Sequence, residues 1–173
     1  MRFGSLACLG LAAGLLASCA TVQKYDASAD IHAFLVSVRD GDRPGFDAHV
    51  DKPALKAQLR ARLIAEVASV HGAQSGETAG AVLAGPLVDV GVELLVRPEV
   101  FRAAAELLGY GPERPIPNIL VIGHQVKPLR GDRVCVMVGK DCEFVFKRED
   151  GVWRMIAYEG DLGSLKKRLS KRL

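Results

Sequence analysis

Residues 133–158 read RVCVMVGKDCEFVFKREDGVWRMIAY, and this stretch decides the fold class. Its apolar side chains follow a period of two, which is typical of half-buried β-strands. The Gly139-Lys140 pair and the Asp150-Gly151 pair interrupt the pattern, and Asp-Gly is a favoured pair in tight hairpin turns. The stretch therefore predicts consecutive antiparallel strands over residues 133–138, 142–147 and 152–158.

The chain upstream of this stretch changes from strand to helix character. Residues 119–126 predict a further strand, which the Arg130-Gly131-Asp132 turn joins to the next one. Residues 109–118 hold three prolines and two glycines and separate this sheet from a helical half. Helices followed by an antiparallel meander predict an α+β fold, a single domain over residues 30–161 with a cystatin-like or NTF2-like layout. Helices are expected over residues 30–41, 52–71, 81–96 and 98–108.

The helix over residues 52–71 has the clearest amphipathic pattern. Asp51 is a good N-cap for it, and leucines and valines recur along one face. We expect Leu59 and Leu63, at the middle of this face, to be buried against the sheet. The segment 81–96 is nearly all apolar, so we expect it to be buried on most sides.

The N-terminus carries a targeting pattern. An apolar run over residues 6–17 has the length of a signal-peptide core and is too short to span a membrane. It ends in LASC at residues 16–19, which resembles a bacterial lipobox. We therefore expect residues 1–18 to be a lipoprotein signal peptide, Cys19 to carry the lipid, and residues 19–29 to be a tether. Ala20 after the cysteine resembles an outer-membrane address facing the periplasm. An ordinary signal peptide with an incidental cysteine is the alternative.

Composition and cysteines narrow the function classes. The formal net charge is +3 and falls to about +2 without Arg2, which argues against nucleic-acid binding over the whole surface. Cys135 and Cys142 are the pair left after the signal peptide and the lipidated residue, and we expect a disulfide between them in an oxidising compartment. A two-residue turn at Gly139-Lys140 would leave them diagonal, so we expect the turn to relax. Neither a metal site nor a cofactor is predicted, because no histidine or cysteine lies at ligand spacing.

Two histidines and a run of acids are the weak candidates for chemistry. His49 lies between Asp47 and Asp51 and could act in acid–base catalysis, and His124 falls in a predicted strand that could face a pocket. Surface or cap-adjacent positions are the more common explanation for such histidines. The acids at positions 40, 42, 47 and 51 do not match a calcium loop, and caps and turns explain them.

The C-terminal residues 162–173 form a basic amphipathic segment. Leu162, Leu165 and Leu169 share one helical face, and five basic residues follow without an acid. Such a segment can lie on an anionic membrane, or its leucines can pack on the sheet as an ordinary terminal helix. The basic residues that would contact a membrane surface are Lys166, Lys167, Arg168, Lys171 and Arg172.

Several turn and cap residues carry a family resemblance. Phe34 with the turn at residues 39–42, then Val50-Asp51 with residues 53–55, and the hairpin at residues 148–154 with Trp153 are all present. Together they resemble the bacterial "domain of unknown function 2939" family, although Lys52 replaces its usual bulky residue. The resemblance covers most of the chain after residue 18 and implies no established active site.

These observations favour a lipid-anchored envelope protein that is a binding or scaffold module without evident catalysis. We expect it to contact the membrane through its lipid and to bind a protein partner or a hydrophobic ligand, but not nucleic acid. The alternative is an NTF2-like enzyme, or a binder of small hydrophobic ligands, that uses a cone-shaped pocket. A buried His–Asp contact in such a pocket would favour the enzyme, and a filled apolar interior would oppose it.

Overall fold

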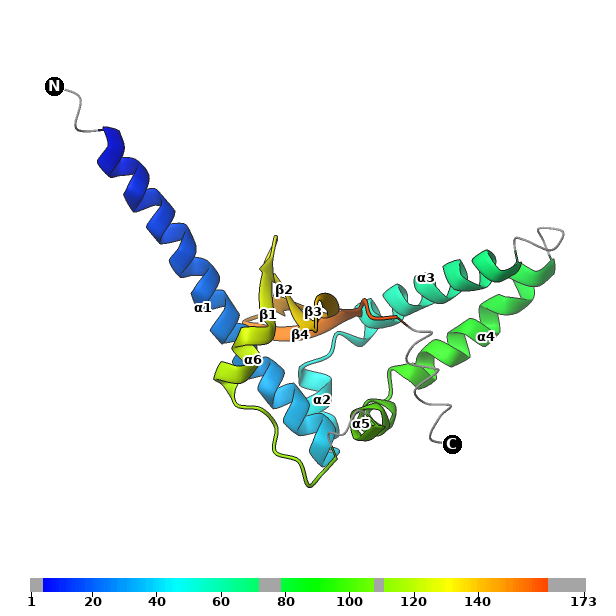
Figure 1. Ribbon diagram of the computed structural model, residues 1–173. Helices are drawn as coiled ribbons and strands as arrows, with labels where there is room; N and C mark the ends of the chain where they lie inside the picture. Colours follow the sequence, from blue (N-terminus) through cyan, green and yellow to red (C-terminus); the bar gives the residue numbers. More distant parts are fainter. Residues whose placement is uncertain (1–4, 72–78, 108–110, 162–173) are drawn as a thin grey trace.

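The computed structural model describes residues 5–71, 79–107 and 111–161 of the 173-residue chain. Helices come first and an antiparallel sheet follows, so the predicted α+β class is confirmed (Figure 1). The elements are α1 (Ser5–Asp40), α2 (Arg43–Ala48), α3 (Lys52–His71), α4 (Ala79–Leu95), α5 (Pro98–Leu107), α6 (Ile119–Gln125), β1 (Val126–Leu129), β2 (Arg133–Val138), β3 (Asp141–Glu149) and β4 (Val152–Tyr158).

The sheet is a meander in which each strand pairs with the next along the chain. The observed bounds of β2 and β4 match the predicted ones. The turn between β3 and β4 consists of Asp150 and Gly151, which have φ angles of 51° and 84°. Positive φ at both central residues is the geometry of a two-residue hairpin turn, and this explains why the Asp-Gly pair located the hairpin.

Helix α1 begins much earlier than predicted. Residues 20–29 are helical, and Ala27 and Ser28 are buried, so the expectation of a tether over this segment is wrong. The reason is packing, since α6 lies against α1 at this level (Figure 1). A Cβ added to Gly123 of α6 would lie 2.9 Å from the Tyr25 ring, so small residues allow this close approach. The helix ends as predicted before Gly41, whose φ is +70°.

The segment predicted as the first strand is mostly helix α6. The side chain of Asn118 accepts a hydrogen bond from the Val121 N–H at 3.0 Å, which caps the start of this helix. Ile122 and Gly123 are buried, and extended structure begins only at Val126. A short apolar run fits a strand or a buried helical turn equally well, and the cap together with contacts to α1 decides for the helix.

Aromatic rings fill the space between the helices and the sheet. The Phe34 ring of α1 lies 5.9 Å from Phe46 of α2, 6.2 Å from Phe101 of α5 and 5.8 Å from Phe146 of β3, between ring centroids. Phe34, Phe46 and Phe146 are buried. One helix residue therefore links two other helices and the sheet in a single core.

The outer edge of β4 is covered by other parts of the chain. The Met155 N–H donates to the His49 carbonyl at 2.8 Å, and the Asp51 N–H donates to the Met155 carbonyl at 3.0 Å. The Trp153 N–H donates to the Asp30 carboxylate of α1 at 2.8 Å. These contacts satisfy backbone groups that an edge strand would otherwise leave open for pairing with another chain.

Helices α3 and α4 form a two-helix arm that extends away from the sheet (Figure 1). Asp51 caps α3 as predicted, since its carboxylate accepts from the Ala54 N–H at 3.0 Å. Leu59 is buried, but Leu63 is only partly buried, so the expectation that Leu63 is central is wrong. The arm leaves the sheet before Leu63, which explains its lower burial.

Helix α4 does not have the burial that its composition predicted. Val88 and Val92 of α4 and Val96 just after it are buried, whereas Val90 is 61% exposed and Leu94 is 45% exposed. Within the described residues, α4 packs mainly on α3 and α5, which cover one side of it. The expectation of burial on most sides is therefore wrong.

Candidate functional site

The predicted disulfide joins Cys135 of β2 to Cys142 of β3, with Cα atoms 5.7 Å apart. The two-residue turn between the strands stays intact, so the expectation that it relaxes is wrong. Instead the register shifts after Val136, and Glu143 is the additional residue on β3. A bulge of this kind bends one strand locally, which gives the diagonal pair a distance suited to a disulfide.

The His49 side chain contacts α1 and α2. Its Nδ1 lies 2.8 Å from the Gly45 carbonyl, and its Nε2 lies 3.8 Å from a carboxylate oxygen of Asp30. The two side chains are 15% and 29% exposed. The second oxygen of Asp30 accepts from the Trp153 N–H, so this carboxylate is already engaged in holding α1 to β4. The pair is a structural junction beside the aromatic core.

The other sequence candidates for chemistry are separated in the structure. Asp47 pairs with Lys52 at 2.6 Å rather than with His49, and Asp51 caps α3. His124 lies on α6 and is exposed, so its placement in a strand is wrong. The described residues contain no group of three or more histidine, cysteine or acidic side chains that could hold a metal ion.

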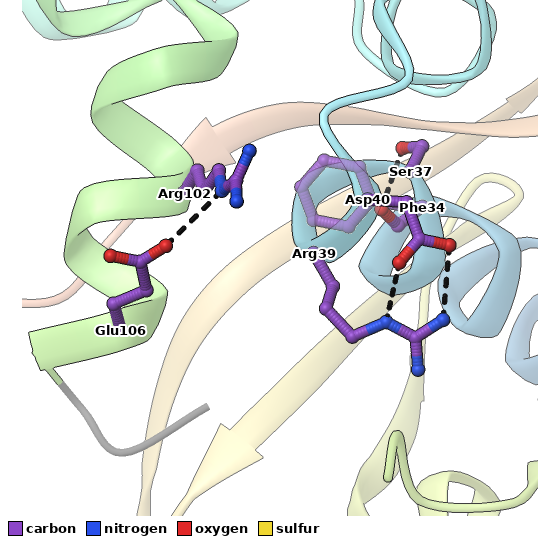
Figure 2. A network of polar contacts seen from close by, with 6 residues as sticks. All are labelled: Phe34, Ser37, Arg39, Asp40, Arg102 and Glu106. Carbon is purple, nitrogen blue, oxygen red and sulfur yellow. Dashed lines mark hydrogen bonds and ion pairs between the residues drawn. The ribbon is translucent and has the colours of Figure 1, made fainter. Parts of the chain in front are cut away.

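Figure 2 shows where Asp40, the first acid of the run, lies at the end of α1. Arg39 donates to its two carboxylate oxygens at 2.6 and 3.0 Å, and these hydrogen bonds lower the pKa of Asp40. Arg102 of α5 adds a smaller electrostatic contribution in the same direction and itself pairs with Glu106 at 3.1 Å. Ion pairs within α1 and within α5 therefore account for these charges.

Asp26 and Asp30 are the polar residues that sequence reasoning missed. The indole N–H of the buried Trp153 donates to Asp26 at 2.9 Å, and the backbone N–H of Trp153 donates to Asp30. Arg148 lies 3.4 Å from the same oxygen of Asp26. Two aspartates four residues apart on one helix face were the available signal, because such a pair can bind one partner element.

An open hollow of about 720 Å³ lies where α2, the start of α3, the end of α4 and the start of α5 meet. Four of its charged side chains pair with one another, Arg43 with Glu99 and Lys52 with Asp47. It is separate from the space that Phe34 and its neighbouring rings fill. The residues that line it are Arg43, Asp47, Lys52, Leu94, Arg97, Pro98, Glu99 and Val100.

The two charged residues of α4 both turn toward α3. Lys56 pairs with Glu93 at 2.5 Å, and Arg60 pairs with Asp89 at 2.6 Å. The hydrogen bond from Lys56 and its charge lower the pKa of Glu93. Both acids are therefore neutralised along the flank of the arm, and the side of α4 that faces away from α3 carries no charge within its described residues.

That side is apolar and exposed. Pro86, Val90 and Leu94 recur every four residues, which places them on one helix face, and all three are exposed. We call these three residues the α4 outer face. Soluble helices normally present polar residues opposite the core, so this face has the pattern of an interaction surface.

A second group of exposed apolar side chains lies on α1 and α6. Val22 and Tyr25 are one helical turn apart on α1, and Ile119, Leu120 and Val121 form the first turn of α6. The two helices pack together, as Figure 1 shows. We call these five residues the α1–α6 patch.

The remaining predicted positions lie at the ends of the chain. Cys19 falls within the backbone of α1. The basic residues 166–172 lie outside the described residues. Among the helices that the structure describes, none is both long enough and apolar enough to cross a membrane.

Comparison with known proteins identifies a family. The family model described as "Protein of unknown function (DUF2939)" matches residues 15–104, just over half of the chain. The match spans most of α1, all of α2 to α4 and most of α5, while the sheet and its β3–β4 hairpin follow it in the sequence. No curated protein and no solved structure matches the chain. The chain belongs to the DUF2939 family of proteins of unknown function.

Proposed function

We propose that this protein is a lipid-anchored component of the bacterial envelope that binds a protein partner through the α4 outer face. The observation that carries the binding role is the exposed apolar face of α4 on the side opposite its buried valines. Burying such a face against a partner removes apolar surface from water, which is the main favourable contribution in protein association.

The geometry of the α4 outer face suits a partner helix. Val90 and Leu94 supply a ridge, and beside them Gly91 has no atom within 4 Å of the position that a Cβ would take. A ridge next to an open position accepts the side chains of an amphipathic helix laid along it. Asp89 and Glu93 beside this face are paired with Arg60 and Lys56, so the flank has no excess of positive charge, whereas helices that lie on membranes usually have one. A protein partner therefore fits this face better than a lipid surface does.

The lipid anchor is proposed because residues 16–19 resemble a lipobox and end the apolar run over residues 6–17. In the lipoprotein pattern, Cys19 becomes the acylated first residue, and Ala20 after it favours the outer membrane with the domain in the periplasm. The disulfide between Cys135 and Cys142 supports this compartment, because such bonds persist in oxidising environments. The enzyme alternative receives no support, since aromatic rings occupy the interior that a substrate would need.

The anchor is tested by metabolic labelling with an alkyne analogue of palmitate in a bacterial host. We expect the full-length protein to take up the label and the Cys19→Ala variant to lose it. A Cys142→Ala variant is the control for other cysteines and should label like the wild type. Label that persists in Cys19→Ala would contradict lipidation at this residue.

The binding role is tested by placing a photo-reactive amino acid at a single position of the protein in living cells. We expect a discrete adduct from position 90 on the α4 outer face. Ala57, which is exposed on α3, is the matched control and should give none. Absence of an adduct from position 90, or equal adducts from both positions, would contradict a specific surface on α4.

A further inference from the structure

Val22 and Tyr25 of the α1–α6 patch follow the proposed lipid attachment residue on the same helix, with no irregular segment between them. Helix α1 is continuous from Cys19 to the core, where Ala27 is the first buried residue described. We infer that the α1–α6 patch rests on the surface of the membrane that holds the Cys19 lipid. This inference rests on the proposed anchor.

The length of the connecting helix sets how far the domain can lie from the bilayer. At 1.5 Å per residue, Tyr25 is about 9 Å along the helix axis from Cys19, and Ala27 is about 12 Å from it. These distances are comparable with the thickness of the headgroup region on one side of a bilayer. A helix of this length cannot hold the domain clear of the membrane. Val22 and Tyr25, which are exposed on this part of α1, therefore lie close to the lipid surface.

The residues of the patch suit that position. Val22 and Tyr25 are exposed on α1, and tyrosine is enriched at membrane interfaces because its ring is apolar and its hydroxyl is polar. On α6, three consecutive apolar residues are exposed, and Leu120 is 62% exposed. The first turn of a helix at a water-exposed surface has no need of three apolar side chains, whereas the boundary between headgroups and acyl chains gives them a favourable environment.

Packing holds the two halves of the patch together. The ring of Tyr25 contacts the backbone of α6 at Gly123, where a Cβ would come within 2.9 Å of it. The nearest acid, Asp26, is already engaged by Trp153 and Arg148. The two helices that carry the patch are therefore packed together, and Asp26 adds no unpaired carboxylate that an anionic membrane would repel.

The test measures the depth of single side chains in a membrane. The full-length lipidated protein is purified, a cysteine is introduced by Leu120→Cys, and an environment-sensitive fluorophore is attached to it. Cys135 and Cys142 are bonded to each other, so the new thiol is the one expected to react. The protein is placed in vesicles of phosphatidylethanolamine and phosphatidylglycerol, with and without a lipid that carries a quencher. The matched control is Val90→Cys, because Val90 is 61% exposed and lies on α4, away from the patch.

We expect the probe at position 120 to shift to shorter wavelength and to be quenched several-fold more strongly by the lipid than the probe at position 90. Flotation of the vesicles reports the anchor separately. If the protein floats while the probe at position 120 stays in a water-like environment, membrane contact of the α1–α6 patch is contradicted, whereas the lipid anchor is not. Equal quenching at both positions would also contradict membrane contact of the patch, and protein that does not float would contradict both. A probe at Val121 should reproduce the result at Leu120.

Discussion

The body of the molecule, built from α1, α2, α5 and the sheet, differs from the α3–α4 arm in what holds it together. In the body, the Phe34 ring contacts three other rings contributed by distant parts of the chain. In the arm, two ion pairs flank a narrow buried strip, and Val90 and Leu94 remain exposed. Apolar residues therefore serve mainly stability in the body and are left available for contact in the arm.

The comparison also explains why the burial of α4 could not be predicted from its hydrophobic content alone. A helix can be apolar all round because neighbours cover it on every side or because a partner does. Helix α1 is covered from several sides over its second half, since α2, α5, α6 and the sheet all contact it. Helix α4 is covered on one side only within the described residues. Burial is thus a property of the neighbours that the fold supplies and not of the segment itself.

The largest predicted difference between the two regions comes from truncating one apolar side chain in each. Phe34→Ala removes a ring from the centre of the body and should lower the free energy of unfolding by about 3–5 kcal/mol. Leu94→Ala on the α4 outer face should change it by less than about 0.5 kcal/mol, because surface substitutions lose little packing. Urea unfolding of the two variants and the wild type measures both values. A loss for Leu94→Ala as large as that for Phe34→Ala would mean that the outer face is packed inside the isolated protein.

Much of the sheet could be predicted from sequence because its signals are local. The Asp150-Gly151 turn requires positive φ at both positions, and few other pairs adopt this geometry easily. Residues 119–125 were wrongly predicted as a strand, because they carry no turn signal of this kind. Their helical state depends on the Asn118 cap and on packing against Tyr25, a residue distant in sequence. Contacts between distant segments decided the elements that local pattern could not.

The candidate functional residues divide in the same way. The Cys135–Cys142 pair could be predicted because few cysteines remained, but the bulge at Glu143 that sets their distance could not. The roles of Asp26 and Asp30 depend on Trp153, more than a hundred residues away. Sequence reasoning placed Asp26 in a tether and Asp30 at the start of the first helix, so neither residue was assigned a contact with the sheet.

A smaller effect is predicted where the body is held by a polar contact. Asp26→Ala removes the acceptor of the buried Trp153 indole N–H and should cost about 1–3 kcal/mol of unfolding free energy. Trp153 is the single tryptophan of the chain, so its fluorescence reports this change directly. The Asp26→Asn variant keeps an oxygen acceptor and should lose less. Equal losses in the two variants would show that charge, rather than the hydrogen bond, provides the stabilisation.

The smallest predicted effect concerns the ion pairs of the arm. Glu93 has a pKa below its ordinary value of 4.5, chiefly because Lys56 donates a hydrogen bond to it. A lowered pKa in the folded state means that the pair stabilises the arm at pH values above the ordinary pKa of glutamate. This contribution is lost as the pH falls through the lowered pKa. The Lys56→Met variant keeps much of the side-chain volume without the charge. We expect the pKa of Glu93 to rise toward 4.5 in this variant, as followed by carboxyl NMR signals in an acid titration.

The body provides the control for this titration. Asp40 also has a lowered pKa, but its main cause is Arg39 on the same helix, so the Lys56→Met substitution should leave the pKa of Asp40 unchanged. If the pKa of Glu93 stays low without Lys56, the remaining positive charges at Arg97 and Lys52 dominate it. The two helices of the arm would then be joined by their buried strip and the Arg60–Asp89 pair, because the Lys56–Glu93 contact would add nothing specific. A rise confined to Glu93 would instead establish that a polar contact aligns α3 with α4 and so sets the direction in which the α4 outer face points.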